Sequence, residues 1–169
     1  MDIREAIYKR RSVRKFQEKP VDDKIIKSLL EDAMAAPSAC NKQPWEFYVI
    51  RNKEKQDLIK SKIMFSNFNS PIMIVVCGNN EVSLTKDNND FWIQDCSAAI
   101  ENILLSAVSF GLGTCWCGLY PVEKRCERVR EILGLPTNII PLGTIHIGYP
   151  EKETEGRTQY KEEKVHYID

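Results

Sequence analysis

A chain of 169 residues, of which 43% are hydrophobic, has the length and apolar content of one folded domain, and we expect residues 1–169 to form it. Its 24 basic and 24 acidic side chains cancel, so no overall field would attract nucleic acid or a membrane surface. There is no recognisable secretory leader, no apolar run long enough to span a bilayer, and no zinc-ligand spacing among the six cysteines. These features predict a cytoplasmic protein with reduced thiols and no metal site.

The first half of the chain alternates between helical and extended patterns. Asp22 is a good helix cap, apolar residues recur at helical spacing from Ile25 to Met34, and Pro37 ends the segment. The expected elements, in order, are helices over 2–9 and 20–37, a loop over 37–44, a strand over 45–51, a solvated helix over 53–62 and a buried strand over 71–77.

The second half contains a helix that is apolar on nearly all faces, over 90–110. In so small a chain, this pattern favours a partner subunit that covers one face. The remaining elements are a polar loop over 79–90, a short strand or turn over 114–120, a helix over 121–134, a strand over 138–150 and a polar arm or disordered segment over 150–169. The sequence therefore predicts an α+β fold with a mixed central β-sheet flanked by helices.

Positive charge gathers in the stretch RRSVRKF, residues 10–16. In an extended segment, Arg10, Ser12 and Arg14 would share one side. Two guanidinium groups beside a hydroxyl suit a phosphate, because the fork of arginine fits two phosphate oxygens. The alternative is a solvated basic turn, which is common in proteins.

Two further stretches are candidate ligand contacts. Ser38, Asn41 and Gln43 can each donate and accept hydrogen bonds, as a planar heterocycle requires, although an ordinary turn would also explain them. The glycine-rich stretch GLGTCWCGLYP, residues 111–121, would let the backbone approach a ligand, or would simply connect a helix to a strand. We expect Cys115 and Cys117 to point to opposite faces of this strand, one into the core and one into a pocket, which argues against a redox pair.

Taken together, RRSVRKF, LLEDAMAAPSACNKQPWEFYVI, GLGTCWCGLYP and PLGTIHIGYP resemble the FMN-dependent nitroreductase family, in the right order and over nearly the whole chain. The resemblance implies an intertwined homodimer with FMN at the subunit interface and a C-terminal arm over 150–169. It also implies that Arg10 and Ser12 hold the FMN phosphate and that Arg14 lies near the pyrimidine edge of the flavin. The residues that the resemblance assigns to FMN binding are Arg10, Arg11, Ser12, Arg14, Pro37, Ser38, Ala39, Asn41, Gln43, Trp116, Cys117, Gly118 and Arg157.

The resemblance implies an oxidoreductase in which NAD(P)H reduces the flavin and a nitroaromatic, quinone or enone acceptor then reoxidises it. The cofactor carries the chemistry, so we assign no catalytic side chain. One departure from the family pattern is Glu155, where some relatives have lysine beside the phosphate. Larger members of the family carry an insertion in the middle of the chain that shapes the substrate pocket; residues 62–92 are short by comparison, so we assign no pocket residues there. The alternatives are a flavin-binding protein without turnover, or a relative that uses flavin for dehalogenation or cleaves the flavin itself.

Overall fold

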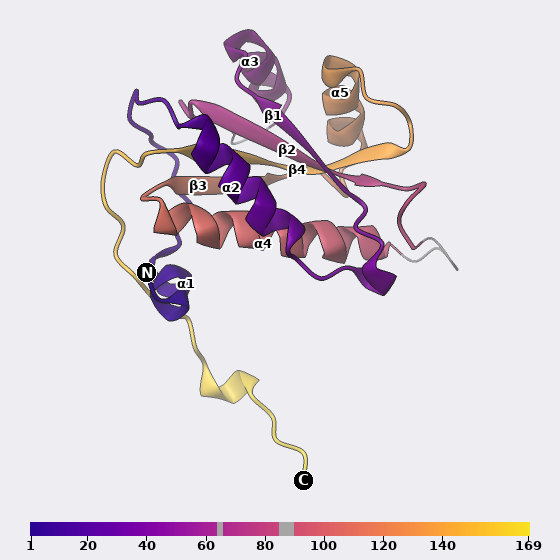
Figure 1. Ribbon diagram of the computed structural model, residues 1–169. Helices are drawn as coiled ribbons and strands as arrows, with labels where there is room; N and C mark the ends of the chain where they lie inside the picture. Colours follow the sequence, from indigo (N-terminus) through magenta and orange to yellow (C-terminus); the bar gives the residue numbers. More distant parts are fainter. Residues whose placement is uncertain (64–65, 85–89) are drawn as a thin grey trace.

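The structure, a computed structural model, describes residues 1–63, 66–84 and 90–169 (Figure 1). The helices are α1 (Ile3–Lys9), α2 (Asp23–Met34), α3 (Lys53–Lys62), α4 (Phe91–Ser109) and α5 (Glu123–Leu133), with short 3-10 turns η1 (Ala39–Asn41) and η3 (Glu162–Lys164). The strands are β1 (Trp45–Ile50), β2 (Ile72–Asn79), β3 (Gly113–Gly118) and β4 (Ile139–Gly148). The elements thus follow the predicted order.

The four strands form one sheet in the order β1-β2-β4-β3, and every neighbouring pair is antiparallel. The α+β class is confirmed, but the expected mixed sheet needs correction. Among the strands described, parallel pairing is limited to an isolated bridge between Ser12 and Thr114. The connection through α3 is long enough for a parallel crossover, and the chain nevertheless returns in the antiparallel direction, which no local pattern specifies.

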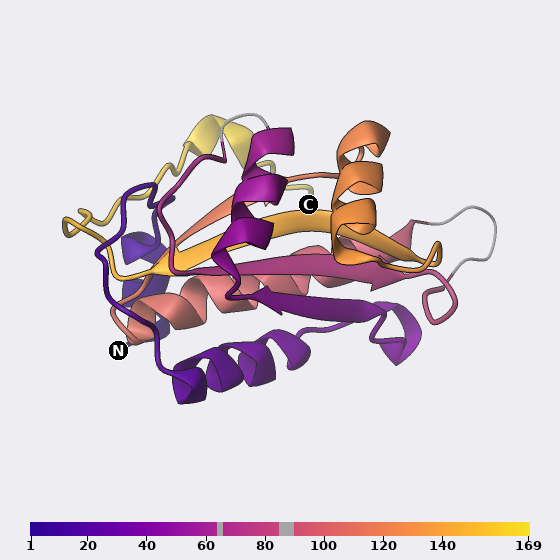
Figure 2. The same ribbon diagram turned by 90° about the horizontal axis from the view of Figure 1, so that it is seen from above.

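Helices cover both faces of the sheet (Figures 1 and 2). On one face, α2 and α4 pack on side chains such as Ile74 and Ile145; on the other, α3 and α5 pack on Met73 and Val75. This arrangement explains why β2 is apolar almost throughout, because a strand covered on both faces buries every side chain.

Helix boundaries follow the sequence signals to within a few residues. Asp22 caps α2, accepting a hydrogen bond from the backbone N–H of Lys24 at 2.7 Å. The helix ends at Met34, before the predicted limit at Pro37, and α5 begins at Glu123 and not at Pro121. Part of the predicted loop over 79–90 and part of the unassigned 62–92 region lie outside the described residues.

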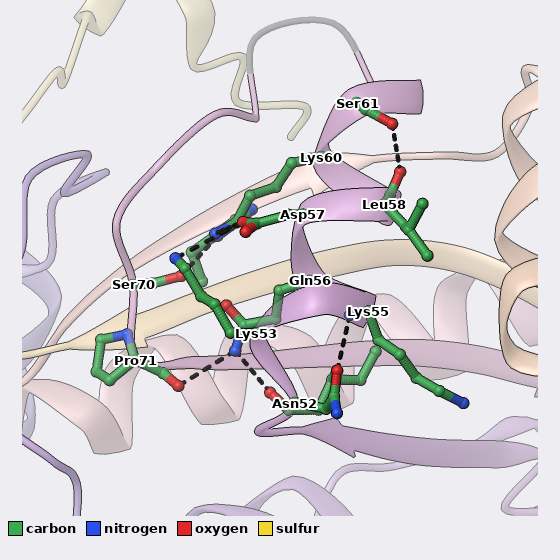
Figure 3. Close-up of polar contacts among 12 residues, drawn as sticks. Asn52, Lys53, Lys55, Gln56, Asp57, Leu58, Lys60, Ser61, Ser70 and Pro71 are labelled. Atoms are coloured by element: carbon green, nitrogen blue, oxygen red, sulfur yellow. Dashed lines mark hydrogen bonds and ion pairs between the residues drawn. The ribbon is translucent and has the colours of Figure 1, made fainter.

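Helix α3 is tied to the sheet by a buried glutamine (Figure 3). The Gln56 Nε2 group donates to the carbonyl of Ile50 at 2.8 Å and to that of Pro71 at 3.2 Å, which links the end of β1 to the start of β2. Lys60 is also buried, beside Asp57 at 3.4 Å. The expectation of a solvated helix therefore holds for only part of α3.

The C-terminal residues 151–169 are exposed throughout. The first part of this arm follows the N-terminal segment of the same chain: the backbone N–H of Glu151 donates to Lys15 O at 3.2 Å, and that of Arg157 donates to Tyr8 O at 3.0 Å. Beyond Arg157 the arm projects away from the body (Figure 1). Within the described parts of the chain, no helix combines the length and apolarity needed to cross a membrane.

His146 of β4 is fully buried and lies opposite Cys115 of the neighbouring strand β3. His146 Nδ1 is 2.8 Å from Ser70 Oγ, and the ring packs edge-on against Phe68 at 5.0 Å. Burial, with a smaller contribution from the nearby Lys60 charge, lowers the pKa of His146 to about 4. The imidazole is therefore neutral in the folded protein near pH 7.

This shift predicts a loss of stability in mild acid. Below pH 6.5 an unfolded His146 takes up a proton, whereas the folded protein does so only near pH 4. The free energy of unfolding should therefore fall by about 3 kcal/mol more between pH 6.5 and pH 4 in the wild type than in His146→Asn, which does not titrate. Urea unfolding across this pH range measures the difference, and parallel curves for the two proteins would contradict it.

Candidate functional site

The basic N-terminal segment is held against β3 by its backbone. The N–H of Val13 donates to Thr114 O at 2.8 Å, and Ser12 pairs with Thr114. Gly113 permits this close approach, because a Cβ at that position would lie 2.6 Å from a Val13 methyl group. The segment is therefore extended here, and Arg10, Ser12 and Arg14 alternate with Arg11 and Val13 as predicted.

The two sides of this segment face different surroundings. Arg14 lines a hollow of about 210 Å³ with Trp116, Cys117 and Gly118 of β3. Arg11 instead lines a separate hollow with Val13 and Thr114. The structure thus brings Arg14 together with the three predicted contacts on β3 and places Arg11 apart from them.

Arg10 and Ser12 remain accessible at the edge of the molecule. Arg10 Nε lies 3.6 Å from Glu101 Oε1 of α4, in an ion pair that stays partly open to solvent. Ser12 is exposed, and its carbonyl accepts a hydrogen bond from Arg14 Nη1 at 3.3 Å. Both groups can therefore meet an anionic ligand from solvent.

The prediction that Cys115 and Cys117 face opposite ways was wrong. Side chains of a strand alternate, so residues two apart share a face. The register places Cys115 opposite His146 and Cys117 opposite Thr144 on the α3/α5 side of the sheet. Trp116 points the other way, where its indole crosses Gly143, a position at which any Cβ would overlap the ring.

The predicted loop contacts lie on a strained stretch of backbone. Cys40, Asn41 and Gln43 have φ angles of 49°, 52° and 50°, in the left-handed region that side-chain-bearing residues seldom occupy. The Ser38 hydroxyl supports this shape by accepting a hydrogen bond from the N–H of Gln43 at 3.0 Å. Such conformations cost about 1–3 kcal/mol each and persist where surrounding contacts impose them, often at binding sites.

Sequence reasoning missed Asp95 of α4, which anchors this loop. Asp95 is buried, and its Oδ1 accepts a hydrogen bond from the N–H of Ala39 at 2.8 Å. Its Oδ2 is buried without a hydrogen-bond partner among the described residues. The available signal was a carboxylate in the apolar first half of the helix, because a buried carboxylate requires hydrogen-bond partners.

Within one chain, the two groups of predicted contacts lie at opposite edges of the sheet. The loop over 37–43 leads into β1, whereas Arg14 and its neighbours flank β3. With three strand spacings between those edges, the separation is about 14 Å. Arg157 lies on the β3 side, since its backbone bonds to Tyr8 at the end of α1.

Comparison with known proteins was made on sequence and on structure. The chain matches the Nitroreductase family over residues 7–68 and 62–149. It is 40% identical over 168 residues to a candidate NADH dehydrogenase/NAD(P)H nitroreductase of Methanothermobacter thermautotrophicus, covering 98% of this chain and 86% of that protein. A protein of the same description from Archaeoglobus fulgidus is 40% identical over 165 residues, covering 95% of this chain and 94% of that one.

Solved structures agree with this assignment. The fold superposes with a TM-score of 0.87 on a protein described as an FMN-dependent nitroreductase of Clostridium difficile, which is 30% identical and is matched over 97% of this chain and 98% of that one. Because the family match spans most of the chain, and relatives share 40% of their residues with it over nearly their full length, the chain belongs to the nitroreductase family.

Proposed function

We propose that this protein is an FMN-dependent oxidoreductase that passes electrons from NAD(P)H to nitroaromatic, quinone or enone acceptors. The observation that carries the proposal is the hollow in which Arg14 meets Trp116, Cys117 and Gly118, beside an extended segment that presents Arg10 and Ser12. Relatives are named for NAD(P)H nitroreductase and FMN reductase activities, which supports the same assignment.

The residues of this chain suit FMN in charge and in shape. An anionic phosphate needs cations and hydroxyl donors, which Arg10 and Ser12 supply at an accessible edge. The hollow of about 210 Å³ is smaller than the roughly 300–1,000 Å³ of typical ligand sites, so one chain would enclose only part of the cofactor. The pre-shaped loop over 37–43 offers the missing polar contacts, but from the far edge of the sheet.

When bound, FMN would supply the electron transfer between the nucleotide and the acceptor. The work of the protein is then to bind and orient. Arg10 and Ser12 would hold the phosphate, and Arg14 would place a positive charge beside the pyrimidine edge. Ser38, Asn41 and Gln43 would meet the polar edges of the ring.

A homodimer would unite the two groups of contacts. Apolar side chains stay exposed around α1 and α2, with Ile3 63%, Ile7 49% and Met34 50% accessible, as expected for faces that a second copy covers. The arm beyond Arg157 also exposes apolar anchors, among them Tyr160, Tyr167 and Ile168. We expect the loop over 37–43 of one subunit to reach the hollow beside β3 of the other. A cytoplasmic location stays a prediction.

Steady-state assays separate the proposal from its alternatives. The purified protein should be yellow, should release FMN on denaturation, and should oxidise NADH or NADPH when menadione or a nitroaromatic compound is added. Bound FMN without turnover would indicate a flavin-binding protein. Consumption of the flavin, or halide release from a halogenated substrate, would indicate the dehalogenating or flavin-cleaving relatives.

Removing the Arg10 guanidinium should weaken FMN binding. The loss of one charge-assisted contact is expected to cost roughly 1.5–3 kcal/mol, or about ten- to a hundredfold in affinity. Lys15→Ala is the matched control, because it removes an exposed charge from the same segment on the opposite side. Titration of the apo-protein by flavin fluorescence quenching tests the pair of variants, and equal affinities would remove Arg10 from the site.

Removing the Asp95 carboxylate should release the loop over 37–43. Asp95→Ala leaves the N–H of Ala39 without its acceptor, whereas Asp95→Asn retains a carbonyl oxygen there. We expect FMN affinity to fall about tenfold in the alanine variant, corresponding to about 1.4 kcal/mol of lost loop order. The asparagine variant should bind more tightly than the alanine variant, and identical affinities for wild type and both variants would contradict the anchoring role.

A further inference from the structure

The hollow beside β3 is lined by a second arginine, which the FMN assignment leaves without a role. Arg125 of α5 lines this hollow together with Arg14, and its Nη1 donates to the carbonyl oxygen of Gly118 at 3.5 Å. Arg125 is half-buried, whereas Lys124 and Glu127 on the same helix are exposed. Its guanidinium group therefore lies beside the end of β3.

The two arginines reach the hollow from opposite sides of β3. Arg14 belongs to the N-terminal segment, which lies along the outer edge of the sheet, whereas α5 packs over β4 on the inner side. The parallel bridge between Ser12 and Thr114 places the Arg14 backbone about two residues, or roughly 7 Å, before Gly118 along the strand direction. The hollow thus has one cation on each side.

Neither positive charge is balanced within the hollow. No acidic side chain lines it, and neither Arg14 nor Arg125 takes part in an ion pair among the described residues. Two like charges in a partly enclosed space repel each other, and a bound anion relieves the repulsion. The charge of this hollow therefore favours an anionic ligand beside each guanidinium group.

The shape of the hollow favours a flat apolar ligand near Arg125. Ile63 and Phe68 form the apolar part of its lining. Gly118 adds no side chain, and a Cβ built there would have only the carbonyl oxygen of Tyr120 within 4 Å, at 3.9 Å. The end of β3 beside Arg125 is therefore open to a ring that carries an anionic group.

FMN would supply an anionic partner for only one of these two arginines. In the function proposed above, the phosphate is matched to Arg10 and Ser12, and the pyrimidine edge is matched to Arg14. The flavin ring has no other anionic group, so Arg125 would face a second ligand. In NAD(P)H, the nicotinamide ring carries a neutral carboxamide and the phosphates lie beyond a ribose. An aromatic acid has its carboxylate directly on the ring and fits both the charge and the apolar lining.

We propose that Arg125 is a specificity-determining residue that selects aromatic electron acceptors bearing a carboxylate group. This inference rests on the proposed function, because it names the acceptor class of the same site. The fork of the guanidinium group can donate two N–H bonds to one carboxylate, while Ile63 and Phe68 flank the ring. The carboxylate orients the acceptor and takes no part in its reduction.

The test compares two acceptors of nearly equal size, para-nitrobenzoate and para-nitrobenzamide, with the FMN-loaded protein. The ratio of their kcat/KM values cancels differences in FMN content and in the folded fraction. The two acceptors differ in intrinsic reactivity, so the change in the ratio between variants is the measure. We expect Arg125→Gln to lower the benzoate-to-benzamide ratio about tenfold, because it removes a charge-assisted contact at a half-exposed position. An unchanged ratio would contradict the proposal.

Matched variants show whether the effect belongs to this guanidinium group. Arg125→Lys keeps the positive charge and should keep most of the ratio. Arg128→Gln removes an exposed charge one turn further along α5 and should leave the ratio unchanged; an equal loss in this variant would mean that the charge of the helix matters and not Arg125. A change in the KM for NADPH alone in Arg125→Gln would assign the residue to the nucleotide phosphate and overturn the proposal.

A binding measurement separates this inference from the proposed function. Isothermal titration of the protein as purified should show benzoate binding that is about tenfold weaker in Arg125→Gln, with benzamide binding and FMN affinity unchanged. If no acceptor is reduced but benzoate binding depends on Arg125, the proposed function fails and the anion site stands. If turnover is normal and benzoate binds both proteins equally, the proposed function stands and this inference fails. A loss of FMN affinity in Arg125→Gln would make the residue a cofactor contact and would also overturn it.

Discussion

The hydrogen bond from the Val13 N–H to the carbonyl of Thr114 is the contact on which the candidate site depends. It holds an extended basic segment against an edge strand, and strand alternation then decides what each side chain can reach. Arg14 is directed to the hollow beside Trp116, Cys117 and Gly118, whereas Arg11 and Val13 face elsewhere. Gly113 has no Cβ, which leaves the space that Val13 occupies. The position of the basic segment against β3 therefore depends on this glycine as well as on the hydrogen bond.

At the far edge of the sheet, a different constraint shapes the loop over 37–43. Three non-glycine residues of this loop adopt left-handed backbone conformations. Such conformations are unfavourable by themselves and persist only where surrounding contacts impose them. Asp95 supplies part of that constraint by binding the Ala39 N–H from a buried position on α4. A pre-shaped polar loop and a basic strand edge are thus built into the same chain but are kept apart by the sheet, so a second copy is the natural way to bring them together.

Local sequence signals predicted most of the elements but not their pairing. The Asp22 cap, the apolar β2 and the apolar α4 were legible because each depends on residues close in the chain. The antiparallel return of β2 beside β1 was not, since strand direction is determined by contacts across the whole fold. At the site, the alternation of Arg10, Ser12 and Arg14 followed from the period of a strand, and the same rule, misapplied, placed Cys115 and Cys117 on opposite faces. The left-handed backbone at Cys40, Asn41 and Gln43 could not be predicted, because none of these residues is a glycine. The hydrogen bond between Asp95 and Ala39 could not be predicted either, because the two residues are 56 positions apart in the sequence.

A complementation experiment tests most directly whether two copies of this chain share each FMN site. One variant carries Arg10→Ala and Arg14→Ala, and the other carries Asn41→Ala and Gln43→Ala; each alone should bind FMN poorly. If the site is shared, a heterodimer of the two has one doubly altered site and one site whose basic segment and loop are both wild type. FMN titration of co-expressed, tandem-purified heterodimers should then recover one high-affinity site per dimer, whereas no recovery would contradict the account and would place each site within a single chain.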